Sequence, residues 1–201
     1  MLPGQRRRTR RPPPMAEAGA DSSPLELQLL VPAGTEAGAL KELRALGVER
    51  VEHVGRGELR LTEPGPLRTV LAAERPTAIY AVRRLAATEL VGLDPETTLR
   101  AALELAGVVA GLNRGRLDGY RLTVAHELGR PPAAVHRLSQ HVGARLGLER
   151  SVGRPDLVLV LRPGADGLEL AARLPRKGED AATGGAPPRR TSPLPRTPQA
   201  P

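Results

Sequence analysis

The side chains best suited to binding chemistry are cations between residues 111 and 174. This stretch carries ten basic and six acidic side chains, a net charge of +4, whereas residues 15–110 carry ten basic and fourteen acidic ones. Guanidinium groups bind phosphate oxygens in a bidentate manner, and glycine lets a backbone approach a phosphate closely. Such contacts hold a nucleic acid without reading its base sequence. The candidate RNA-binding residues are Arg114, Arg116, Arg130, Arg137, His141, Arg145, Arg150 and Arg154.

Three of these side chains have the spacing of one helix face. Arg137, His141 and Arg145 lie at positions i, i+4 and i+8 of a predicted helix. Arg114 and Arg116 lie in a glycine-rich link, and the remaining three flank the helix. The alternative interpretation is an ordinary solvated helix face in a chain with 28 arginines and two lysines.

The sequence lacks the motifs of several common enzyme classes. It has no cysteine, no Gly-x-x-x-x-Gly-Lys-Ser/Thr phosphate loop and no Gly-x-Ser-x-Gly turn, and Gly55-Arg-Gly57 continues without the third glycine of a dinucleotide site. His136 and His141 point about 140° apart on a helix, so they cannot chelate one ion. We therefore expect no catalytic residue, cofactor or metal site. No apolar run approaches the roughly 20 residues of a membrane span, so no membrane partner is expected.

The net charge of +8 belongs to the two ends of the chain. Residues 1–14 contain five arginines and no acid, residues 175–201 contain five basic and two acidic residues, and residues 15–174 contain twenty of each. Both ends are rich in proline and have no apolar period, which predicts disorder over 1–24 and 175–201. Met15 follows three prolines and is an alternative to Met1 as the start of translation.

Residues 25–88 alternate between strand and helix patterns. Strands are expected over residues 25–31, 51–54, 58–61 and 79–87, and helices over 34–46 and 66–73. Gly55-Arg56-Gly57 separates two of these strands and predicts a hairpin. The order β-α-β-β-α-β is the ferredoxin-like one.

Residues 89–174 follow a different order, α-β-α-β-β. Asp94 and Pro95 combine a capping carboxylate with a proline at the first helical position, and Gly107 can end the helix that follows. Strands are expected over residues 120–125, 157–161 and 168–174. A second helix, opened by Pro131 and Pro132, is expected to bury Val135, Leu138, Val142 and Leu146. The predicted fold class is α+β.

The scarcity of aromatic residues restricts how the chain could bind RNA. It has two tyrosines, Tyr80 and Tyr120, and neither Phe nor Trp. Proteins that bind single strands usually stack bases on such rings. We therefore expect any RNA to be held through phosphates, backbone groups and shape, with Tyr120 in the core.

Several short patterns follow one another in a familiar order. In the first half they are Gly34-Thr35-Glu36 through Glu42-Leu43 and Leu46-Gly47, Arg56-Gly57-Glu-Leu-Arg-Leu61, and Arg75-Pro-Thr77-Ala78-Ile-Tyr-Ala-Val82. In the second half they are Tyr120-Arg-Leu-Thr-Val124, Ser139-Gln140-x-Val142-Gly143 with Leu146, and Pro155-Asp156-Leu157-Val158. Together they resemble the THUMP domain and the ferredoxin-like domain that precedes it in RNA-modifying enzymes, with Pro76 and Tyr80 as departures from the family's pattern.

The resemblance implies a ferredoxin-like domain over 25–88 and a THUMP-like domain over 89–174. It further implies binding of RNA, chiefly tRNA near its acceptor end, by a module that delivers the substrate to a catalytic methyltransferase domain or subunit. The sequence after Leu174 has neither a glycine-rich cofactor loop nor an Asn/Asp-Pro-Pro-Tyr motif. We therefore expect a cytoplasmic RNA-binding module without enzyme activity of its own.

Two alternatives stay open at this point. One is a truncated or split tRNA methyltransferase whose S-adenosylmethionine domain is encoded elsewhere. The other is a protein-interaction module whose basic ends contact polyanions without specificity.

Overall fold

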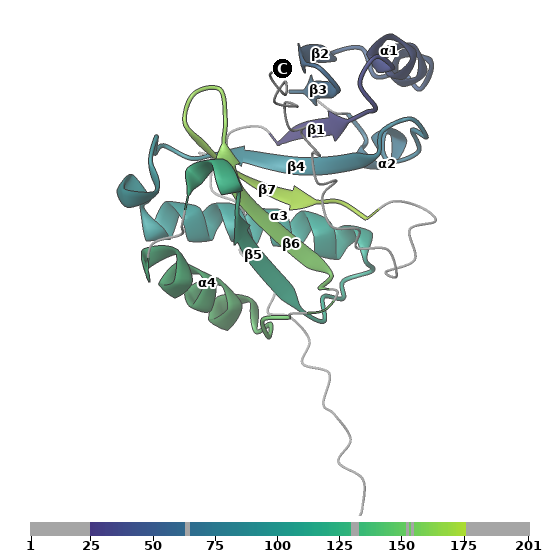
Figure 1. Ribbon diagram of the computed structural model, residues 1–201. Coiled ribbons are helices and arrows are strands. Elements are labelled where there is room, and N and C mark those ends of the chain that lie inside the picture. The colour runs from purple at the N-terminus through teal and green to yellow at the C-terminus, as the bar shows by residue number, and fades with distance from the viewer. Residues whose placement is uncertain (1–24, 63–64, 130–132, 152, 154, 176–201) are drawn as a thin grey trace, which may run out of the picture.

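Seven strands of the computed structural model form a single sheet, which Figure 1 shows with its helices. The structure describes residues 25–62, 65–129, 133–151, 153 and 155–175. The strands are β1 (Glu26–Leu30), β2 (Glu52–Gly55), β3 (Glu58–Leu61), β4 (Ala78–Arg84), β5 (Tyr120–Val124), β6 (Leu157–Pro163) and β7 (Leu168–Arg173). The helices are α1 (Glu36–Ala45), α2 (Leu67–Val70), α3 (Pro95–Leu112) and α4 (Ala133–Leu146), with short 3-10 turns η1 (Leu90–Gly92) and η2 (His126–Leu128). The fold is therefore mixed α/β.

The strands and helices lie close to the positions that the apolar periods predict. Three boundaries were wrong: the strand expected to reach residue 87 ends at Arg84, the helix expected to reach residue 73 ends at Val70, and α3 continues past Gly107 to Leu112. A glycine inside a helix costs about 1 kcal/mol. Burial of Val109, which is 0% exposed, offsets that cost in the following turn. The predicted disordered ends, apart from Pro175, and the helix start at Pro131 lie outside the described residues.

The sheet order is β2-β3-β1-β4-β7-β6-β5. β4 and β7 pair antiparallel, with Tyr80 opposite Arg173 and Arg84 opposite Glu169. At the far edge β5 runs parallel to β6. Strands from both predicted halves thus share one sheet, and the division into domains at residue 88 stays a prediction.

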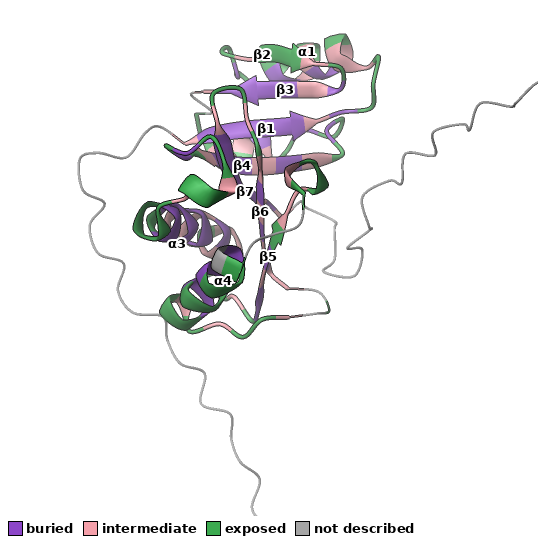
Figure 2. Ribbon diagram, turned by 60° about the vertical axis from the view of Figure 1, so that its left-hand side comes forward, coloured by how far each residue is buried: buried purple, intermediate pink, exposed green. Residues whose placement is uncertain are grey.

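One face of the sheet carries the apolar core. Side chains alternate between faces along a strand, so Leu27, Leu29 and Ile79 lie on the same face as Leu159 and Leu170. These five residues are at most 1% exposed. Ala39 and Leu43 of α1 and Val70 of α2 belong to the same buried cluster, and Figure 2 shows α3 and α4 against one side of the sheet.

The opposite face carries a buried network of charges. Arg60 contacts Glu26 at 3.5 Å and Glu169 at 2.9 Å, and the Arg60 side chain is only 7% exposed. Glu169 also contacts Arg162 at 3.2 Å, and Glu26 contacts Arg84 at 3.0 Å. Arg60, Arg84 and Arg162 of this face are therefore paired with carboxylates.

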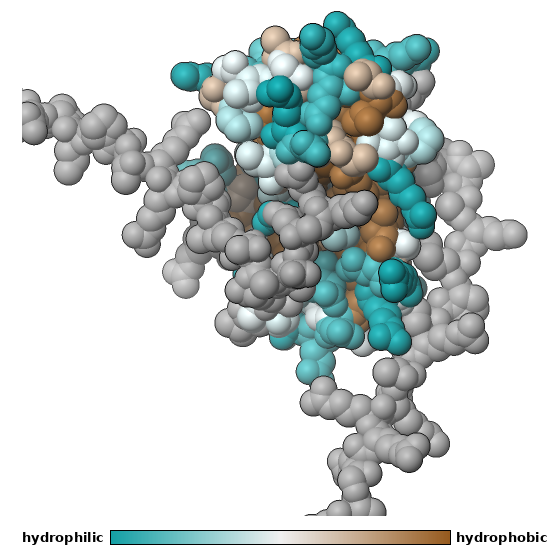
Figure 3. All heavy atoms as spheres, turned by 90° about the vertical axis from the view of Figure 1, so that its right-hand side faces the viewer, coloured by the Kyte–Doolittle hydropathy of each residue, from teal (hydrophilic) through white to brown (hydrophobic). Residues whose placement is uncertain are grey.

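The surface of the described residues exposes few large apolar side chains. Val54 is 48% and Val91 is 88% exposed. Figure 3 shows one side of the molecule on which polar side chains surround a narrow band of apolar ones. Among the described residues, no helix combines the length and the hydropathy needed to cross a bilayer.

Candidate nucleic-acid interface

Two loops meet at the end of the sheet where β5 and β6 begin, at the lower edge of Figure 1. The first loop joins α3 to β5 and the second joins α4 to β6. Tyr120 N–H donates to Glu149 O at 3.1 Å, and Ser151 N–H donates to Tyr120 O at 2.9 Å. Leu157 N–H donates to Gly119 O at 3.2 Å. These bonds fix the backbones of the two loops side by side.

The first loop turns sharply because two consecutive residues adopt left-handed backbone angles. Arg114 has φ of 56° and Gly115 has φ of 79°. Gly115 N–H reaches back to Ala110 O at 2.7 Å, which satisfies a carbonyl at the helix end. This turn leaves Arg114 and Arg116 exposed at the surface.

The second loop is positioned by α4. Val135, Leu138 and Val142 are 5%, 6% and 1% exposed, which confirms the predicted buried stripe, although Leu146 is only partly buried. Arg137, His141 and Arg145 are all exposed. In Figure 2 the outward side of α4 is exposed and its inward side is buried.

The predicted cations divide into three groups. Arg114, Arg116, Arg145 and Arg150 lie at or beside the two joined loops, while Arg137 and His141 lie further along α4. Arg137 and Arg145 are about 12 Å apart along the helix axis. Arg130 and Arg154 lie outside the described residues. We call the six described members of the set the basic end: Arg114, Arg116, Arg137, His141, Arg145 and Arg150.

The basic end differs electrostatically from the charged sheet face. None of its six residues forms an ion pair with another described residue, and all six are exposed. An exposed arginine without an internal carboxylate partner keeps its donors for a ligand. Proteins hold phosphate groups with such side chains.

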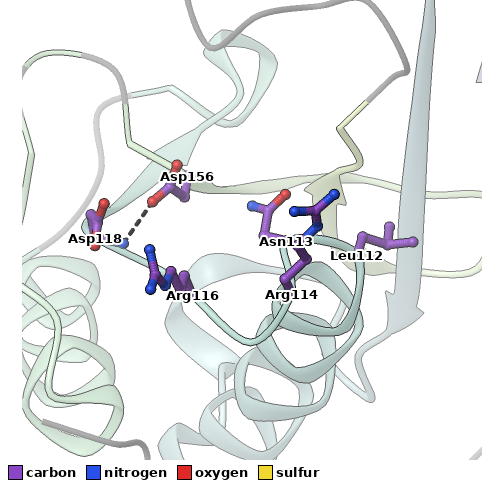
Figure 4. A pocket seen from close by; sticks show the side chains of 6 residues that line it. All are labelled: Leu112, Asn113, Arg114, Arg116, Asp118 and Asp156. Carbon is purple, nitrogen blue, oxygen red and sulfur yellow. Dashed lines mark hydrogen bonds between the residues drawn. The ribbon is translucent and has the colours of Figure 1, made fainter. Parts of the chain in front are cut away.

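A hollow of about 350 Å³ opens between the first loop and the start of β6. Its lining residues are Leu112, Asn113, Arg114, Arg116, Asp118 and Asp156. We call it the loop hollow. Figure 4 shows Asp118, Asp156 and Arg116 near one another on one side of the hollow, and Asn113 and Arg114 on the other side. The dashed line is the bond from Asp118 N–H to Asp156 Oδ2, 2.6 Å long.

Arg121 contributes to this end, although the sequence did not single it out. Its guanidinium donates to Ser151 O at 3.5 Å and to Gly153 O. It therefore holds the second loop against β5. Strand alternation places Arg121 on the charged sheet face, but no local pattern indicates which loop folds over it.

A second hollow of about 530 Å³ lies beside α1, lined by Gly34, Glu36, Ala37, Leu40, His53 and Arg56. Glu36 accepts a hydrogen bond from Gly57 N–H at 2.7 Å. Backbone donors, Gly34 first, lower the pKa of Glu36, and His53 contributes a smaller effect of the same sign. This carboxylate already occupies the start of α1, which disfavours an anion there.

The described residues offer no cluster suited to metal binding. They contain no group of three or more His, Asp or Glu side chains that could hold an ion. The absence of a metal site in the rest of the chain stays a prediction.

Comparison with known proteins finds structures with a similar fold but no matching protein family. No protein-family model and no curated protein matches the sequence. The crystal structure of TrmN from Thermus thermophilus is similar at a TM-score of 0.56 and 18% identity, over 76% of this chain and 46% of TrmN. PH1313 from Pyrococcus horikoshii Ot3 is similar at a TM-score of 0.52 and 11% identity, over 76% of this chain and 55% of PH1313.

A 4-thiouridine synthetase in complex with RNA and bound ATP superimposes at a lower TM-score of 0.47, with 15% identity, over 76% of this chain and 42% of the synthetase. The likeness to TrmN and PH1313 establishes a shared fold. The chain spans about half the length of these solved structures.

Proposed function

We propose that this chain is an RNA-binding module that docks a structured RNA, tRNA near its acceptor end, for an RNA-modifying methyltransferase. The RNA binds at the basic end, and chemical modification is left to a catalytic partner. Arg130 and Arg154, which flank α4 in the sequence, belong to the same proposed set of contacts.

One observation carries the proposal: the arginines of the basic end have no carboxylate partner among the described residues. Arg60, Arg84 and Arg162 of the charged sheet face, by contrast, are paired with Glu26 and Glu169. An RNA backbone supplies phosphate oxygens, which can accept hydrogen bonds from exposed guanidinium groups that have no carboxylate partner. The proposed contact between the basic end and the RNA is electrostatic and does not use aromatic stacking. The ring of Tyr120 is buried, at 2% exposed, and cannot stack on a base.

The fold supports the same function. The chain shares its fold with TrmN, and its sequence patterns resemble the THUMP domain of RNA-modifying enzymes. The partner enzyme and the tRNA substrate belong to the proposal and rest on this resemblance.

The test is tRNA binding by the full chain, measured by fluorescence anisotropy over a range of salt concentrations. Arg114→Gln with Arg116→Gln should weaken binding and reduce the slope of log K against log salt by about 1.8, since each lost phosphate contact removes about 0.9. Arg145→Gln with Arg150→Gln should do the same. A matched control, Arg44→Gln with Arg68→Gln, removes two exposed cations elsewhere and should leave the slope unchanged.

Two results would contradict the proposal. One is equal weakening by the control pair, which would indicate diffuse attraction to charge. The other is loss of all binding when only residues 1–14 and 175–201 are removed, which would favour the protein-interaction alternative with basic ends.

A further inference from the structure

The loop hollow is lined by both positive and negative side chains, whereas a site for phosphate alone would need only positive ones. Arg114 and Arg116 are cations, whereas Asp118 and Asp156 place two carboxylates in the same 350 Å³ hollow. None of the four side chains forms an ion pair with another described residue. The carboxylates therefore do not serve to neutralise the arginines.

Only one of the two carboxylates accepts a hydrogen bond from a described residue. Asp156 Oδ2 accepts the Asp118 N–H at 2.6 Å, so Asp156 holds the turn of the loop. The Asp118 carboxylate is exposed and has no hydrogen-bond partner among the described residues. Asp118 is therefore the group that is free to meet a ligand.

A carboxylate beside a phosphate chain is repulsive unless it accepts a hydrogen bond. An ionised carboxylate is an acceptor only, so its ligand must offer an O–H or N–H. A ribonucleotide offers both features within one unit: a phosphate for the arginines and a 2′-hydroxyl donor for the carboxylate. The 2′-hydroxyl is also the group by which proteins distinguish RNA from DNA.

We infer that the loop hollow binds one ribose–phosphate unit of the RNA, with Arg114 and Arg116 on the phosphate and Asp118 accepting a hydrogen bond from the 2′-hydroxyl. This inference rests on the proposed function and makes Asp118 the residue that selects RNA. The volume of 350 Å³ is at the small end of the range of about 300–1,000 Å³ for ligand sites. It suits one unit of a longer chain.

The experiment uses the full chain and three hairpins of identical sequence: RNA, DNA and 2′-fluoro RNA. The 2′-fluoro hairpin keeps the A-form helix but lacks the hydroxyl donor, so it separates recognition of the hydroxyl from recognition of helix shape. We expect the wild type to bind RNA about tenfold more tightly than 2′-fluoro RNA, the effect of one hydrogen bond to a charged group. Asp118→Ala should abolish this difference, because it removes a hydrogen bond from the RNA complex and an unrelieved repulsion from the complexes with the other two hairpins.

The substitution is mild because the bond to Asp156 comes from the Asp118 backbone N–H and persists in the alanine variant. Glu49→Ala is the matched control: it removes one exposed carboxylate from the other half of the chain and should raise affinity for all three hairpins slightly and equally. Equal wild-type affinity for RNA and 2′-fluoro RNA would overturn the inference. So would a preference for RNA that survives Asp118→Ala. Failure of every hairpin to bind would instead contradict the proposed function.

Discussion

The ring of Tyr120 occupies the space that a side chain at Gly143 would need. A Cβ built on Gly143 would lie 2.6 Å from the Tyr120 hydroxyl oxygen and 2.6 Å from ring atom Cε1. The hydroxyl donates to Ser139 O, one helical turn away. Because Gly143 has no side chain, α4 approaches β5 closely, and Arg145 near the end of α4 lies beside the two joined loops.

Gly143→Ala should destabilise the protein. Alanine favours a helix over glycine by up to about 1 kcal/mol, but overpacking against a buried ring costs about 1–3 kcal/mol. We expect a net loss of about 1 kcal/mol in the free energy of unfolding, measured by urea denaturation. Gly111→Ala is the control, since a Cβ there meets nothing within 4 Å, and it should leave stability unchanged or raise it.

A stability loss of the same size in a Tyr120→Ala background would contradict this account. Without the ring, the alanine at position 143 has no clash, and only its helix preference should remain.

The sequence predicted this fold well where the signals were local. Apolar periods located the strands and helices, and the i, i+4, i+8 spacing correctly indicated that Arg137, His141 and Arg145 are exposed on α4. The pairing of Tyr80 with Arg173 joins residues far apart in the chain, and no local pattern encodes such a partner. The contact between Tyr120 and Gly143 could not be predicted either, because no local sequence pattern encodes it.

The candidate site shows the same limit. Arg114 and Arg116 could be singled out from a glycine-rich link, but Asp118 and Asp156 become neighbours only because Asp118 N–H bonds across to the second loop. For Arg121 the sequence predicts only a position in a strand. Its role depends on where the chain returns after α4.

Arg121→Met should loosen the second loop. The guanidinium donates to Ser151 O and Gly153 O, so its loss removes two anchors of the segment that carries Arg150. Hydrogen exchange of the Ser151 amide, which bonds to Tyr120 O at 2.9 Å, should accelerate severalfold. The affinity for tRNA should fall as well, because Arg150 is no longer held in place.

A double-mutant cycle separates this positioning role from direct phosphate contact. If Arg121 acts through the loop, Arg121→Met should have little further effect on tRNA affinity in an Arg150→Gln background. Full additivity of the two substitutions would show that Arg121 acts independently. Arg121→Lys, which retains donors, should recover part of the amide protection.

Arg60→Met should be among the more damaging single substitutions. The Arg60 side chain joins Glu26 and Glu169, which are 12% and 3% exposed, and its removal leaves a buried carboxylate with one partner fewer. Breaking a buried pair costs about 3 kcal/mol or more, reduced here because Glu169 keeps Arg162. We expect a loss of about 2 kcal/mol, whereas Arg68→Met at an exposed position should change stability by less than about 0.5 kcal/mol. Equal effects of the two substitutions in urea denaturation would contradict a stabilising role for this network.

Asp94 should make the stability of α3 depend on pH in the acid range. Its carboxylate accepts hydrogen bonds from the Thr97 hydroxyl and, at 2.9 Å, from the Thr97 backbone N–H, and these bonds lower the pKa of Asp94. A carboxyl whose pKa is lower in the folded state stabilises the protein above its unfolded pKa and loses that contribution as the pH falls through the folded pKa. Asp94→Asn retains a cap that does not titrate. The wild type should therefore exceed Asp94→Asn in urea midpoint above about pH 5, and the difference should shrink as the pH falls below the ordinary aspartate pKa of 3.8 and vanish only below the lowered folded-state pKa. A difference that stays constant from pH 7 to pH 3 would show that the ionised carboxylate of Asp94 does not stabilise the helix start.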